Sequence, residues 1–146
     1  MTQVNHKIVR KFIAAMHEGV ITDELVTEDF HVWIVGSDEM ANRESYVQGI
    51  ALLPRVFPGK LQFEIKSITA EGDRAIAEFS GLGTTQGGEI YRNDYLYLFR
   101  IRADVADAIA FLGLWTCNGT LNRSGFCSPE YDDLAEETRQ EDERSE

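Results

Sequence analysis

The side chains best suited to bind or transform a small molecule are gathered in residues 89–102, Glu-Ile-Tyr-Arg-Asn-Asp-Tyr-Leu-Tyr-Leu-Phe-Arg-Ile-Arg. Their character alternates with a period of two, which predicts a long strand with neighbours on both faces. One face carries Tyr91, Asn93, Tyr95, Tyr97 and Phe99. An aromatic wall with several hydroxyls and one amide is typical of a pocket for a mostly apolar small molecule. An ordinary core whose tyrosine hydroxyls reach the rim has the same pattern, so both interpretations stay open at this point.

Two further residues are candidates for acid-base chemistry. His31 belongs to a predicted strand, residues 30–35, and shares a face with Trp33. An imidazole that points into the pocket there would be a general base, with Tyr97 as a hydrogen-bond donor; a structural histidine is the alternative. Asp38 follows that strand at the expected mouth of the pocket, where a carboxylate would act as a base or face solvent.

Composition excludes several function classes. The chain has 146 residues and a net charge of -11, which argues against nucleic acid or an anionic membrane as a partner. No apolar run reaches the roughly 18 residues of a membrane span, and the N-terminus lacks the apolar core of a signal peptide. We therefore expect a cytoplasmic protein, in which Cys117 and Cys127 are reduced thiols. No metal site and no cofactor is predicted.

The negative charge is concentrated at the C-terminal end. Residues 128–146 hold nine acids against Arg139 and Arg144, with too few apolar side chains for a core of their own. We predict a single domain over residues 1–127 and a solvated acidic tail over residues 128–146. Docking of one short tail helix is the alternative.

The rest of the chain alternates between helical and strand patterns. Asn5 as N-cap and Gly19 as stop delimit a first helix whose apolar residues recur at helical spacing: Ile8, Val9, Phe12, Ile13 and Met16. Residues 22–27 are predicted as one or two further helical turns, and Asn42 caps a helix from Arg43 to Leu53. Strands are predicted at residues 30–35, 61–66, 75–83, 89–102 and 108–117. This order indicates an α+β fold, with helices packed on one face of a mixed, mostly antiparallel sheet.

Three local patterns accompany this order of elements. They are Trp33 followed by Gly36, Glu71-Gly72-Asp73 before the third strand, and Tyr91-x-Asn93-x-Tyr95-x-x-x-Phe99 in the fourth. Together they resemble the SnoaL-like branch of the nuclear-transport-factor-2-like superfamily, close to ketosteroid isomerase, over residues 4–118. The resemblance implies a strongly curved sheet around a conical pocket for a small hydrophobic ligand. It also implies a homodimer through the outer face of the sheet.

The resemblance implies particular catalytic constellations, which this chain matches poorly. A ketosteroid-isomerase-like site needs a carboxylate base and two acidic hydrogen-bond donors. Alignment places Trp33 at the base and Phe12 and Tyr97 at the donors, so that only Tyr97 could still donate. The acids that limonene-epoxide-hydrolase-like and polyketide-cyclase-like members carry on the last strand are missing. Leu114 and Thr116 occupy that strand here, and with Phe12 and Trp33 they are expected to line the pocket.

Two functions stay open on this basis. The first is an enzyme, an isomerase, dehydratase or cyclase of an alicyclic, steroid-like or polyketide-like molecule, with His31 or Asp38 as base and Tyr97 or Asn93 as donor. The second is a non-catalytic ligand-binding or dimeric interaction module that keeps the aromatic pocket without the acids. In both, a homodimer is expected through the sheet face that carries Arg92 and Asp94, because exposed leucines on that face would otherwise leave an apolar patch in water.

Overall fold

The structure, a computed structural model, describes residues 2–35, 38, 40–102 and 108–116. Its elements are α1 (Thr2–Glu18), β1 (Val26–Ile34), β2 (Met40–Asn42), α2 (Arg43–Ala51), α3 (Leu53–Val56), β3 (Gln62–Glu71), β4 (Arg74–Thr84), β5 (Ile90–Arg102) and β6 (Ala108–Thr116). The expectations for Cys117, Cys127 and the acidic tail lie outside the described residues.

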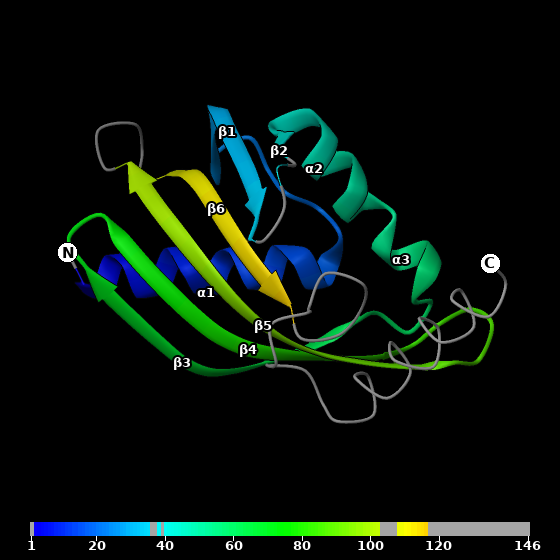
Figure 1. The fold of residues 1–146 in the computed structure, drawn as a ribbon. Coiled ribbons are helices and arrows are strands. Elements are labelled where there is room, and N and C mark those ends of the chain that lie inside the picture. Colours follow the sequence, from blue (N-terminus) through cyan, green and yellow to red (C-terminus); the bar gives the residue numbers. More distant parts are fainter. Residues whose placement is uncertain (1, 36–37, 39, 103–107, 117–146) are drawn as a thin grey trace, which may run out of the picture.

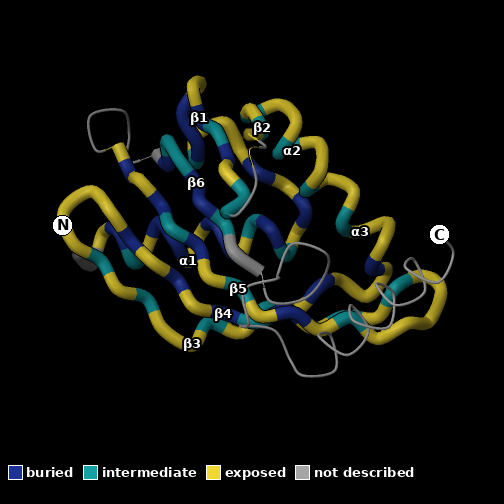
Figure 2. Tube along the Cα trace, viewed as in Figure 1, coloured by how far each residue is buried: buried dark blue, intermediate teal, exposed yellow. Residues whose placement is uncertain are grey.

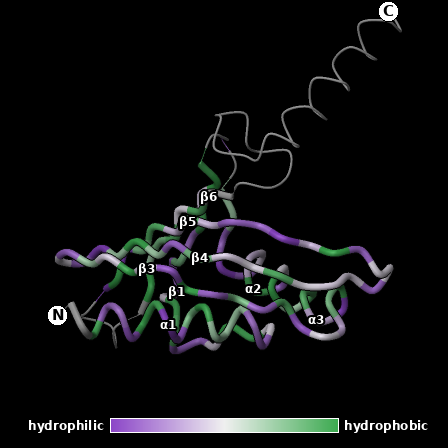
Figure 3. The backbone as a smooth tube through the Cα atoms, turned by 90° about the horizontal axis from the view of Figure 1, so that it is seen from below, coloured by the Kyte–Doolittle hydropathy of each residue, from purple (hydrophilic) through white to green (hydrophobic). Residues whose placement is uncertain are grey.

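Six strands form one curved sheet in the order β2-β1-β6-β5-β4-β3 (Figure 1). All neighbouring strands are antiparallel except β1 and β6, which run parallel. The predicted α+β fold with a mixed, mostly antiparallel sheet is confirmed. Figure 3 shows α1 and α3 on one side of strands β3 to β6. We call the side of the sheet that the helices cover its inner face, and the opposite side its outer face.

The hydrophobic core lies between the helices and the inner face. Helix α1 contacts β3 and β4, and α2 contacts β1. Buried and exposed residues alternate along β4 and β5 (Figure 2). The largest fully buried side chains come from both layers: Val9, Phe12, Met16, Phe30, Val32, Phe79, Phe99, Ile109 and Leu112. The predicted apolar stripe of the first helix is therefore confirmed.

The ends of the helices agree only in part with the sequence-based expectation. Asn5 is not an N-cap, because α1 already begins at Thr2. Its buried amide nitrogen instead donates to the carbonyl oxygen of Gly72 at 2.7 Å, which ties α1 to the β3–β4 turn. Asn42 is the N-cap of α2 as predicted, since its side chain accepts from the amide of Ser45 at 2.9 Å. No helix within the described ranges has the length and apolar character that crossing a bilayer requires.

The region before and after the first predicted strand differs from expectation. Strand β1 begins at Val26 and no helix lies between it and α1, so the helical turns predicted for residues 22–27 are wrong. A single turn, closed by the Leu25 amide and the Thr22 carbonyl at 3.1 Å, is found there. Val26 pairs with Ile109 of β6, and the register then shifts before His31. The short strand β2, which directly precedes α2, was not predicted. It pairs antiparallel with β1. Pairing with another strand, distant in sequence for β1 and adjacent in sequence for β2, decides both segments rather than local propensity.

Gly19 provides a test of how α1 meets the following helices. It has a φ of 80°, and a Cβ atom there would lie 2.6 Å from Cγ of Pro54. Gly72 also has a positive φ, 59°, but a Cβ atom on Gly72 would have no neighbour within 4 Å. We expect Gly72→Ala to lower the free energy of unfolding by about 1 to 2 kcal/mol. Gly19→Ala should cost about 2 to 4 kcal/mol, because overpacking adds to the backbone strain.

Chemical denaturation of the two variants measures this difference. Equal losses of stability at Gly19 and Gly72 would show that Pro54 moves aside without cost, and the packing argument would then be wrong.

Candidate functional site

The inner face of β5 carries the aromatic wall that the sequence pattern indicated. Asn93, Tyr97 and Phe99 are buried, and Tyr91 and Tyr95 are half-buried. The residues between them are more exposed, with the alternation of a strand that has two different faces. The wall therefore faces the helices.

Three polar groups converge on this face. The hydroxyl oxygens of Tyr91 and Tyr95 are 2.6 Å apart, a hydrogen-bonding distance at which either can be the donor. The amide nitrogen of Asn93, which lies between them in the strand, donates to the Tyr91 hydroxyl at 3.0 Å. We call these three side chains the Tyr91–Asn93–Tyr95 cluster. It offers hydroxyl and amide groups that could hold one oxygen atom of a ligand.

Aromatic rings from β3, from β4 and from the residue after α3 surround the cluster. Phe57, directly after α3, has its ring centroid 5.3 Å from that of Tyr91. Phe79 of β4 stacks on Tyr95 at 4.9 Å, and Phe63 of β3 lies 6.2 Å from Tyr95. Sequence reasoning missed these neighbours, because only the register of three strands and the course of α3 bring them together. The cluster is thus a small polar group in apolar surroundings.

The surroundings of the cluster keep the Tyr95 phenol neutral. Burial raises the pKa of Tyr95, and the adjacent Tyr91 raises it further. A phenol with a raised pKa keeps its proton throughout the physiological range, so it can donate a hydrogen bond but cannot serve as a base. The cluster is therefore suited to recognise a carbonyl, hydroxyl or developing oxyanion.

Tyr97 has a different environment, deeper in the core. The residue is 6% exposed, and its ring contacts those of Phe79 and Phe99. Burial raises the pKa of Tyr97, as do the neighbouring Tyr46 and a hydrogen bond to it. The Tyr46 hydroxyl in turn donates to the sulfur of Met16 at 3.4 Å. Tyr91 raises the pKa of Tyr97 as well, but the hydrogen bond of the Tyr97 hydroxyl is made with Tyr46, within the core.

Phe12 also lies in this core and not at an open surface. It is fully buried, and its ring contacts Phe30, Tyr46 and Phe99. The position where a ketosteroid-isomerase-like tyrosine was looked for therefore contributes packing.

His31 and Trp33 lie on the outer face, so the expectation that His31 points into the pocket is wrong. Their neighbours Phe30 and Val32 are buried on the inner side, and alternation turns His31 and Trp33 the other way. The His31 ring centroid is 5.1 Å from that of Phe111 on β6, and Trp33 is 38% exposed. Because β1 is apolar on both faces, its sequence did not tell which side is covered.

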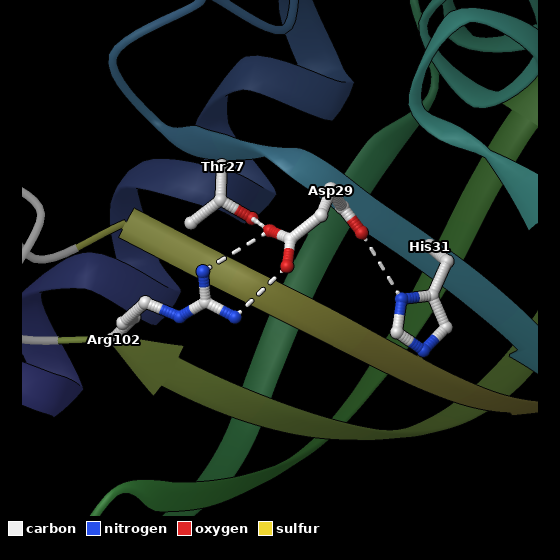
Figure 4. A network of polar contacts seen from close by, with 4 residues as sticks. All are labelled: Thr27, Asp29, His31 and Arg102. Atoms are coloured by element: carbon white, nitrogen blue, oxygen red, sulfur yellow. Dashed lines mark hydrogen bonds and ion pairs between the residues drawn. The ribbon is translucent and has the colours of Figure 1, made fainter.

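His31 takes part in a polar network on the outer side (Figure 4). Its Nδ1 lies 3.1 Å from the carbonyl oxygen of Asp29, and since a carbonyl only accepts, Nδ1 carries the proton. The Asp29 carboxylate accepts from Thr27 at 2.6 Å and from both terminal nitrogens of Arg102 at 3.2 and 3.0 Å. The bonds from Thr27 and Arg102 lower the pKa of Asp29. This network joins β1 to β5 across β6 and has a structural role.

The remaining sequence-based candidates, Asp38, Leu114 and Thr116, lie at different places in the fold. Asp38 is exposed. Leu114 is half-buried and pairs with Tyr97 in the β5–β6 ladder, which places it on the inner face. Thr116 pairs with Tyr95 through the same ladder.

Three surface hollows formed by the described residues lie away from the cluster. One of 790 Å³ follows α1, one of 630 Å³ lies between β1 and the start of α2, and one of 320 Å³ surrounds Phe111 on the outer face. None of the three is lined by Tyr91, Asn93, Tyr95 or Tyr97. Within the described part of the chain, His, Cys, Asp and Glu side chains form no group of three that could hold a metal ion.

Comparison with known proteins agrees with this geometry. The family model of the SnoaL-like domain matches residues 9–110. The chain belongs to the SnoaL-like family. No curated protein sequence matches it.

Solved structures similar to this SnoaL-like chain share its fold at low identity. A candidate SnoaL-like polyketide cyclase from Jannaschia sp. CCS1 is 17% identical, with a TM-score of 0.65 over 80% of this chain and 87% of that one. AclR from Streptomyces galilaeus is 18% identical, with a TM-score of 0.68 over 80% of each chain. A protein with a ketosteroid isomerase-like fold from Catenulispora acidiphila DSM 44928 is 17% identical, with a TM-score of 0.58 over 74% of this chain and 83% of that one. These likenesses establish the fold alone.

The different surroundings of the tyrosines generate a prediction for Tyr97. Replacing it by Phe keeps the ring in the core of this SnoaL-like domain and removes one hydrogen bond, to Tyr46. We expect Tyr97→Phe to lower the free energy of unfolding by about 0.5 to 1.5 kcal/mol, measured by urea denaturation. The Phe57, Phe63 and Tyr95 rings do not depend on that hydroxyl, so the near-ultraviolet circular dichroism of the other aromatic residues should persist. A global loss of that signal would contradict the assignment.

Proposed function

We propose that this SnoaL-like domain binds a small, mostly apolar and uncharged organic molecule on the inner face of its sheet, with one oxygen of the ligand at the Tyr91–Asn93–Tyr95 cluster. The observation that carries the proposal is the convergence of two phenol hydroxyls and an amide at 2.6 and 3.0 Å inside an aromatic wall. Because Tyr91 and Tyr95 are only half-buried, a ligand can reach their edges without unfolding the core. Alicyclic, steroid-like and polyketide-like molecules have the required shape and polarity.

The lack of buried charge argues for an uncharged ligand. Among the described residues, the buried polar side chains are Asn5, Thr27 and Asn93, none of which is ionised. A carboxylate brought to the cluster would lose its hydration without meeting a cation, which costs several kcal/mol. A carbonyl or hydroxyl loses much less and gains hydrogen bonds from the phenols.

The same inner face favours binding over catalysis. Proton transfer needs a positioned base, and the described inner face supplies phenols and an amide instead of a carboxylate or imidazole. His31 lies on the outer face and Asp38 is exposed. Enzymatic action as an isomerase, dehydratase or cyclase is the second candidate. It is favoured by the short Tyr91–Tyr95 contact, which could donate to an oxyanion, with Asp38 as the candidate base.

A matched set of probes tests the binding function. 2-Naphthol carries one hydroxyl, naphthalene carries none, and 2-naphthoate carries a charge, so titration followed by probe fluorescence measures each contribution. We expect 2-naphthol to bind more tightly than naphthalene and 2-naphthoate to bind weakest. Tyr95→Phe should remove about 1 to 1.5 kcal/mol of binding free energy for 2-naphthol and leave that for naphthalene unchanged.

Tyr97→Phe is the control, since it removes a hydroxyl from the same strand face outside the cluster. Equal affinities for 2-naphthol and naphthalene in the unaltered protein, or equal effects of the two variants, would contradict the proposed function. Mass spectrometry of small molecules that copurify with the protein would then identify the true ligand class.

We further propose a homodimer through the outer face of the sheet. Ile76, Leu82 and Leu96 are 42%, 45% and 40% exposed there, on adjacent strands β4 and β5. Asp94, on the same face, pairs with Lys66 of β3 at 3.6 Å. Apolar side chains gathered on one sheet face and bordered by charged pairs are typical of an interface between copies of a chain.

Light scattering on the eluting protein tests the dimer at micromolar concentration. Leu96→Glu should raise the dissociation constant about a hundredfold or more, because the carboxylate would be buried without a partner. Val20→Glu is the control, since Val20 is 60% exposed and lies away from the sheet, before β1. A monomeric unaltered protein, or dissociation by the control substitution alone, would overturn the proposal.

A further inference from the structure

The cluster lies opposite two residues of β4 that have no side chain, Gly81 and Gly83. On the inner face of that strand, Phe79 is followed by Gly81 and Gly83, which pair with Asn93 and Tyr91 in the β4–β5 ladder. A strand interior loses stability when it carries glycine, so two inward glycines in succession need a reason. The reason here is steric, because neither glycine has a φ in the left-handed region that only glycine favours.

Tyr95 fills the space left at Gly81. A Cβ atom on Gly81 would lie 3.0 Å from Cε2 of Tyr95 and 3.4 Å from its hydroxyl oxygen. The first distance is shorter than carbon atoms in contact normally allow. The Tyr95 ring therefore leans along the strand over Gly81, with Phe79 stacked against it at 4.9 Å. In this orientation its hydroxyl meets that of Tyr91, four residues away, at 2.6 Å.

We propose that Gly81 is the residue that positions the Tyr91–Asn93–Tyr95 cluster, and through it sets the preference of the inner face for ligands with an uncharged oxygen. Gly81 has no polar side chain and touches no ligand oxygen itself. It acts through the tilt of the Tyr95 ring. The proposal rests on the binding function proposed above and deepens it, because it identifies which residue outside β5 makes the phenol pair possible.

A methyl group at position 81 would be too close to aromatic rings on two sides. Phe63 closes the site from the other side, with Cε1 3.3 Å from the same Cβ position. The Tyr95 ring would have to rotate away, and because a hydrogen bond weakens steeply with distance and angle, the contact with Tyr91 would be lost. Gly113 of β6 offers a matched comparison, since a Cβ atom there would lie 3.4 Å from the Phe111 ring, an ordinary contact on the outer face.

A double-mutant cycle with 2-naphthol and naphthalene tests the proposal. Gly81→Ala and Tyr95→Phe should each raise the dissociation constant of 2-naphthol about five- to tenfold, the loss expected for one hydrogen bond. Each should change that of naphthalene by less than about twofold. The double variant should bind 2-naphthol no more weakly than either single variant, because both changes remove the same interaction. Gly113→Ala should bind both probes like the unaltered protein.

Additive losses in the double variant, or an equal loss for naphthalene, would overturn the positioning role of Gly81. A measurement on the ligand-free protein distinguishes failure of the positioning role of Gly81 from failure of the proposed binding function. In the empty protein, the hydroxyl proton of the Tyr91–Tyr95 hydrogen bond should give a downfield NMR signal that disappears in Gly81→Ala and in Tyr95→Phe and persists in Gly113→Ala. If the signal survives in Gly81→Ala, the proposal is wrong even where 2-naphthol binds as expected. If the signal behaves as expected and 2-naphthol binds no better than naphthalene, only the preference assigned to the cluster fails.

Discussion

The ring of Phe12 reaches from α1 to the centre of the core, where its centroid lies 6.4 Å from Phe30 of β1, 6.1 Å from Tyr46 of α2 and 5.5 Å from Phe99 of β5. Replacing a buried phenylalanine of this kind by alanine lowers the free energy of unfolding by about 3 to 5 kcal/mol. Because it holds α1 and α2 on one side of the sheet, it decides which face of β5 is enclosed. The Tyr91–Asn93–Tyr95 cluster follows from that choice, since it lies further along the same face, where Phe57 covers it in place of α1.

The two faces of the sheet separate charge from neutral polarity. On the outer side, Asp29 holds Arg102 and Asp94 holds Lys66, each pair exposed to water. On the inner side the polar groups are phenols and amides, which need only a hydrogen-bond partner to be buried. A charged group on the inner face would need a counterion there as well. The described sheet therefore has ion pairs on its outer face and uncharged, hydrogen-bonded polar groups on its inner face.

The sequence predicted the fold better than the site, and particular residues show why. The period of two along residues 89–102 placed Tyr91 through Phe99 on one face, because aromatic residues alternate with charged residues and leucines along β5. In β1 the same pattern failed for His31, since both faces carry apolar residues and only packing against Phe12 selects the inner one. Nor does alternation distinguish Tyr97, whose hydroxyl meets Tyr46, from Tyr95. That difference depends on how far along β5 the helices cover its inner face.

Gly81 shows a further limit of reading one strand at a time. Its role depends on the ladder that sets it opposite Asn93 and on the tilt of Tyr95, neither of which is encoded near residue 81. The SnoaL-like fold at 17% to 18% identity leaves room for such differences, because the sheet can form with many inner-face sequences. In this chain the position aligned with a catalytic base is Trp33, which faces outward. The polar groups of the inner face consequently come from β5, and the glycines of β4 leave the space in which the Tyr95 ring and its hydroxyl lie.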